Sequence, residues 1–106
     1  MARATLEKIR SLERIYEMNY GDEFLDQALD KIISHELSRD QESLNALQED
    51  LNSLEEKYGL SSEEFFEKFQ KGQLEDTADF MEWNALYKMY SRLKNRLSIL
   101  QGHERE

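Results

Sequence analysis

Two stretches of the chain carry apolar side chains at alternating spacings of three and four residues. One stripe lies within residues 44–58 and the other within residues 80–100. This spacing is the heptad pattern of a helix that packs along another helix. In an antiparallel arrangement that pairs Leu54 with Trp83, nearly all facing positions are apolar on both sides, and Asp40 is the exception. The sequence therefore predicts an all-α protein built on a long, coiled-coil-like antiparallel helical hairpin.

Glycine marks the ends of the predicted helices. The chain contains no proline, which long helices exclude, and each of its four glycines follows a segment with helical periodicity. Ser61 followed by Glu64 is a capping box, which predicts that a short helix begins at the tip of the hairpin. We expect one domain over residues 1–106, with the N-terminal helix packing on the long one. The predicted helices span residues 4–18, 22–58, 61–71 and 77–101.

Charge is distributed unevenly between the two arms of the hairpin. Residues 17–82 contain 19 acidic and 5 basic residues, whereas residues 83–103 contain four basic residues and no acid. In the predicted register Arg96 lies one position from the facing partner of Asp40, and Lys88 lies opposite Glu49. Ion pairs of this kind favour the antiparallel orientation, although each exposed pair contributes only about 0–1 kcal/mol.

Composition excludes several classes of function. The chain has no cysteine, no apolar run near the roughly 20 residues of a membrane span and no apolar secretion signal, so we expect a cytoplasmic protein without a membrane segment. With a net charge of −9, its surface opposes binding to nucleic acid. We expect no cofactor. His35 lacks the second histidine four residues later that a helical zinc site needs.

One enzymatic alternative rests on carboxylates. The acids between Glu63 and Asp79 resemble the paired carboxylates with which all-α nucleotide pyrophosphohydrolases hold magnesium. The spacing between the pairs is shorter here, and Glu64 already has a capping role. A small divalent-metal-dependent hydrolase of nucleotide type, using carboxylates near Glu64 and Asp79, is therefore the alternative to a protein with no catalytic site.

Three segments carry a resemblance to a known family. They read EKYGLSSEEFFEKFQKGQL at residues 56–74, DFMEW at 79–83 and LYKMYSRLKNRL at 86–97. The pattern resembles small bacterial and archaeal helical proteins of antitoxin type, which are encoded beside a putative toxin gene. It covers about two thirds of the chain and leaves out the N-terminal helix. The resemblance implies a non-enzymatic protein that binds and neutralises a toxin partner.

The residues also suggest where partners bind. Phe65 and Phe66 are adjacent, so both cannot easily be buried by one short helix, and an exposed aromatic ringed by acids is a plausible anchor for a protein. The apolar stripe of residues 25–37 extends past the end of the predicted C-terminal helix, so the N-terminal helix, a second copy of the chain or a partner must cover it. We expect some apolar surface to remain for self-association, and therefore a homodimer. The expected partner-binding residues are Glu55, Glu56, Glu63, Glu64, Phe66 and Tyr87.

Overall fold

The computed structural model describes residues 2–102 of the chain. These residues form four α-helices and no strand, which confirms the all-α prediction. No helix among them is long and apolar enough to cross a membrane. The helices are α1 (Ala2–Glu17), α2 (Glu23–Tyr58), α3 (Ser62–Gln70) and α4 (Ala78–Leu100).

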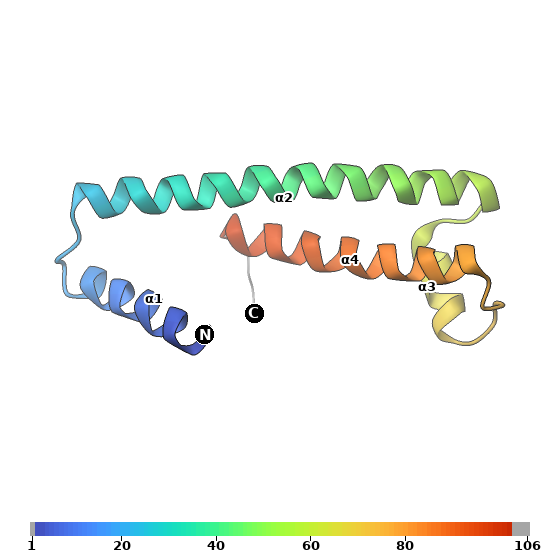
Figure 1. Ribbon diagram of the computed structural model, residues 1–106, viewed down its shortest axis with the longest axis horizontal. Helices are drawn as coiled ribbons and strands as arrows, with labels where there is room; N and C mark the ends of the chain where they lie inside the picture. The colour runs from blue at the N-terminus through green and yellow to red at the C-terminus, as the bar shows by residue number, and fades with distance from the viewer. Residues whose placement is uncertain (1, 103–106) are drawn as a thin grey trace. The chain divides into compact units, whose positions relative to one another are not determined.

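Helix α4 runs antiparallel beside the second half of α2, as Figure 1 shows. Two side-chain contacts fix the register between the two helices. Arg96 Nε donates to Asp40 Oδ2 at 2.5 Å near one end, and Lys57 Nζ donates to Asp79 Oδ2 at 2.8 Å at the other. Both contacts agree with the predicted register, and the seam carboxylate Asp40 finds the guanidinium expected for it.

The core of the hairpin lies at its tip, where α2, α3 and α4 meet. Leu51, Phe65 and Trp83 are the largest fully buried side chains, and one comes from each helix. The Phe65 and Trp83 rings are stacked, with centroids 4.1 Å apart and planes inclined by 5°. Trp83 Nε1 donates to the hydroxyl of buried Ser62 at 2.9 Å. Burial of side chains this large contributes about 2–3 kcal/mol each.

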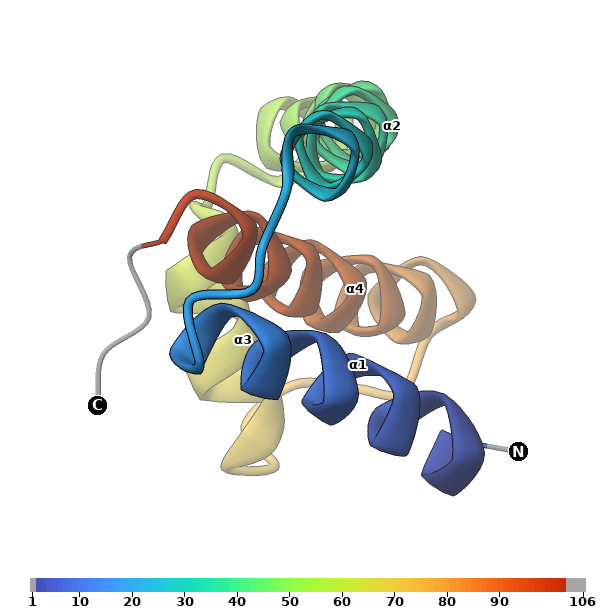
Figure 2. The same cartoon turned by 90° about the vertical axis from the view of Figure 1, so that its left-hand side faces the viewer.

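Helix α3 begins with the predicted capping box. Ser61 Oγ accepts a hydrogen bond from the Glu64 backbone N–H at 3.1 Å, and Glu64 Oε1 accepts one from the Ser61 backbone N–H at 3.4 Å. Gly59, with φ of +64°, reverses the chain between α2 and α3 in the left-handed conformation that suits glycine. These local contacts set α3 across the end of the hairpin and against α4 (Figure 2).

The chain divides into two compact units, and the boundary between Ser34 and His35 lies inside α2. The expectation of a single domain therefore remains a prediction. In the first unit Asp22 Oδ1 caps the start of α2 by accepting from the Leu25 N–H at 2.8 Å. Tyr16 on α1 donates its hydroxyl proton to Asp26 on α2 at 2.7 Å, so the end of α1 contacts the start of α2.

Candidate partner-binding site

The two aromatic residues predicted to bind a partner lie together at the hairpin tip. The rings of Phe66 on α3 and Tyr87 on α4 have centroids 4.9 Å apart. Both side chains are half-buried, and both pack against the core cluster of Leu51, Phe65 and Trp83. The structure thus brings the predicted pair into contact, and each ring presents only part of its surface to solvent.

The four predicted carboxylates divide into two pairs with different roles. Glu64 completes the capping box, and Glu55 Oε2 accepts a hydrogen bond from the Ser62 backbone N–H at 2.8 Å. Both therefore stabilise the start of α3, where the positive end of the helix dipole favours a carboxylate. Glu56 and Glu63 are exposed and make no ion pair within residues 2–102.

A small pocket opens between α2, α3 and α4 beside these residues. Its volume is about 200 Å³, which is smaller than the roughly 300–1,000 Å³ of sites for small organic ligands. Lys94 lies at one side, with its ammonium 5.5 Å from the centre of the Tyr90 ring. Sequence reasoning missed several of the lining residues, because they are polar and follow no motif. The pocket is lined by Gln48, Leu51, Glu55, Ser61, Ser62, Glu63, Tyr87, Tyr90, Ser91 and Lys94.

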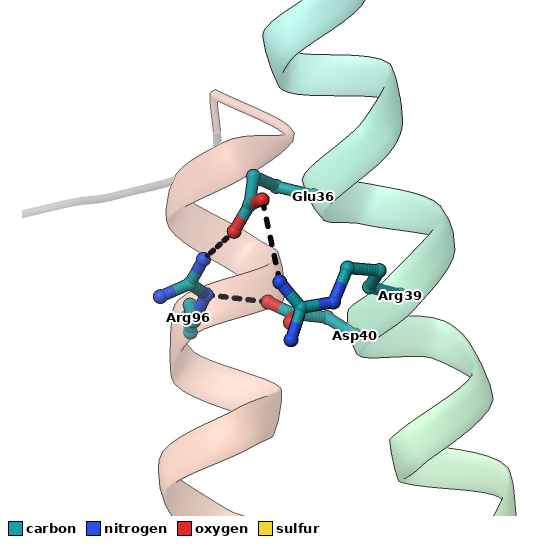
Figure 3. A network of polar contacts seen from close by, with 4 residues as sticks. All are labelled: Glu36, Arg39, Asp40 and Arg96. Carbon is teal, nitrogen blue, oxygen red and sulfur yellow. Dashed lines mark hydrogen bonds and ion pairs between the residues drawn. The ribbon is translucent and has the colours of Figure 1, made fainter.

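The far end of the hairpin carries an ion network, shown in Figure 3. The Arg96 guanidinium bonds to the carboxylates of both Glu36 and Asp40, and Arg39 lies 3.8 Å from the other oxygen of Glu36. Asp40 is the most enclosed of the four, because its side chain is only 13% exposed. This network neutralises the acids of α2 at one end of the hairpin.

The remaining acids of the hairpin are not neutralised by α4. The predicted pair of Lys88 with Glu49 does not form, and Arg92 also makes no ion pair within the described residues. Five exposed carboxylates along the second half of α2 and the start of α3 therefore have no cationic partner among the described residues. They are Glu42, Glu49, Asp50, Glu56 and Glu63.

The carboxylates of the alternative hydrolase site are bonded to protein groups. Asp79 Oδ2 accepts hydrogen bonds from Lys57 Nζ at 2.8 Å and from the Tyr58 hydroxyl at 2.5 Å. These two bonds hold the pKa of Asp79 below its usual value, and they raise the pKa of Lys57 and of Tyr58. Glu64 is held by the capping box. Over residues 2–102, no three His, Asp or Glu side chains are grouped so that they could hold a metal ion.

Comparison with known proteins gives no relative for this chain. No family model, no curated protein and no solved structure matches it.

Proposed function

We propose that this protein is a non-enzymatic binding module for a basic partner protein, and that the partner is a toxin encoded by a neighbouring gene. The observation that supports this most directly is the row of exposed carboxylates on α2 and α3 without a cation. A row of this kind attracts a basic protein and raises its association rate. The proposal that this partner is a toxin rests on the resemblance of the sequence to antitoxin-like proteins.

The pocket beside α3 gives this surface a specific feature. At about 200 Å³ it has room for one long side chain, and Glu55 and Glu63 line it together with Tyr87. The two carboxylates outnumber Lys94, the one basic residue in the lining, so a lysine or arginine fits such a site. Its aliphatic stem can lie on the tyrosine ring while its charged end meets Glu63, which makes no ion pair within the described residues. We therefore propose that a basic side chain of the partner enters this pocket.

The experiment is capture of the neighbouring gene product after co-expression, followed by a binding titration at two salt concentrations. Replacing Glu56 and Glu63 with glutamine removes two charges and preserves side-chain size. We expect at least a tenfold weaker affinity, about 1.4 kcal/mol, and a smaller dependence on salt. The matched control replaces Glu7 and Glu13 on α1 with glutamine, which changes the net charge equally, and it should bind nearly as the wild type does.

Two outcomes count against the proposal. If the wild-type protein captures nothing from the neighbouring gene, the toxin is not its partner. If capture occurs but Glu56→Gln/Glu63→Gln and the control bind equally well, the acidic surface is not the interface. The carboxylates are a cleaner probe than the aromatics, because Phe66→Ala or Tyr87→Ala also removes packing from the core.

A further inference from the structure

Exposed apolar side chains are concentrated in the N-terminal unit. Of the twelve large hydrophobic residues that are exposed in the described chain, eight lie between Leu6 and Ile33. The most exposed are Phe24 at 75%, Ile32 at 57% and Ile9 at 55%, apart from Tyr20 in the turn. Among the residues whose burial the structure describes, every buried one lies at Leu47 or beyond. The first unit thus has no core of its own within the described residues.

The spacing of the apolar residues on α1 is typical of a helix that packs against another helix. Leu6, Ile9 and Tyr16 recur along one side of α1, at the spacing of a helix that buries a stripe. Two helices in a unit of about 34 residues cannot cover both of their stripes, and units of that size rarely fold alone. The apolar stripes of α1 and of the start of α2 therefore need a further layer.

The exposed area matches what a stable dimer needs. We take the full accessible area of one large side chain as roughly 200 Å². The exposed fractions of the eight residues then add up to about 850 Å² of apolar surface. A typical specific interface uses about 800 Å² from each partner. About 230 Å² of this area belongs to Met18 and Tyr20 between the two helices. The first unit as a whole therefore exposes about as much apolar area as one partner contributes to a typical interface.

The charge distribution indicates that a second copy of the chain covers this apolar surface. Residues 1–34 contain five basic and seven acidic residues, so they carry only −2 of the total charge of −9. Within the unit, α1 has four basic and three acidic residues, whereas residues 22–34 have one basic and four acidic residues. The two helices thus have opposite net charge, and a surface with both signs can complement itself across a twofold axis. Residues 35–106 carry the other −7, so an interface made by residues 1–34 uses the less acidic part of the chain.

We propose that α1 and the first turns of α2 form the self-association surface of this protein, and that two copies join there as a bundle of four helices. Antiparallel bundles bury such stripes on facing helices. This inference rests on apolar exposure in the first unit and is independent of the proposed toxin partner, which concerns the acidic surface of the hairpin.

The test compares two isoleucines with similar exposure. Ile32→Asp places a charge in the proposed interface, whereas Ile99→Asp does so on α4, where the isoleucine is 51% exposed. Sedimentation velocity from micromolar to millimolar concentration should give twice the 12.7 kDa monomer mass for the wild type and for Ile99→Asp. Ile32→Asp should dissociate about a hundredfold more easily, because a twofold dimer contains the substitution twice.

The single tryptophan separates dissociation from unfolding. Trp83 is fully buried in the other unit, so its fluorescence reports whether the hairpin remains folded. Ile9→Asp on α1 is a second variant, and it should also dissociate with the Trp83 signal unchanged. A wild type that stays monomeric to millimolar concentration overturns the proposal. Dimers that persist in both Ile32→Asp and Ile9→Asp, or that Ile99→Asp dissociates equally, overturn it as well.

Discussion

The hydrogen bond between Trp83 and Ser62 offers a sharp test of the hairpin core. Ser62→Ala removes the only partner that the structure gives to the indole N–H, which is 2.9 Å from the hydroxyl and fully buried. An unsatisfied buried donor costs about 1–3 kcal/mol. For a domain of this size, each kcal/mol lowers Tm by about 4 °C, so we expect a loss of roughly 4–12 °C. Thermal unfolding followed by circular dichroism measures this change.

A double-mutant cycle isolates the hydrogen bond from other effects of the substitution. Trp83→Phe removes the donor, so adding Ser62→Ala in that background should cost almost nothing, while the same change costs about 1–3 kcal/mol beside tryptophan. The matched control is Ser53→Ala on the exposed face of α2, which should leave Tm unchanged or slightly higher. Equal costs in the two backgrounds would refute the assigned hydrogen bond.

Three further expectations follow from the structure. Leu47→Asp puts a charge into the seam, where the leucine is 9% exposed, and should cost about 3 kcal/mol or more in a denaturant titration; an unchanged midpoint would contradict the register. Arg96→Met leaves Asp40 without its cation and should cost about 1 kcal/mol, less in high salt, so identical melting curves in low salt would count against it. The hydrogen bond to Asp26 raises the pKa of Tyr16 to about 12. An ultraviolet titration should therefore show one tyrosine that ionises at higher pH than an ordinary tyrosine, and Tyr16→Phe should remove this transition. Because the folded pKa exceeds the ordinary value of 10.0, this bond stabilises the fold fully below pH 10.0, and its contribution is lost as pH rises through 12.

Local signals made most of the fold predictable. The heptad stripes, the missing proline and the capping box at Ser61 place four helices within two residues of their observed ends. The antiparallel register also follows from the sequence, because the two apolar stripes face each other when Leu54 is paired with Trp83. This register places Arg96 one position from the residue that faces Asp40, and the two side chains are hydrogen-bonded in the structure. Each of these signals depends on residues that are close in sequence or on the regular geometry of a helix pair.

The arrangement at the candidate site could be predicted only in part. The sequence indicated that Phe66 and Tyr87 would be exposed, but the two rings pack on each other, which depends on the angle at which α3 meets α4. The partner-binding role of Glu55 stays a prediction, and the sequence did not indicate that its carboxylate also accepts a hydrogen bond from the Ser62 N–H at the start of α3. The predicted pair of Lys88 with Glu49 also does not form. An exposed ion pair gains little free energy, so facing positions on two helices are not enough to bring two long side chains together.

The position of the core at the tip has a consequence for how the chain folds. Ser62 and Trp83 meet across 21 residues of sequence, whereas Arg96 and Asp40 meet across 56. Closing the shorter loop loses less chain entropy, so we expect the contacts at the hairpin tip to form first. The contacts between α2 and α4 should then form progressively from the tip towards Arg96. Native-state hydrogen exchange should then show the slowest amides near Leu51 and Trp83, with protection falling along α4 towards Leu100.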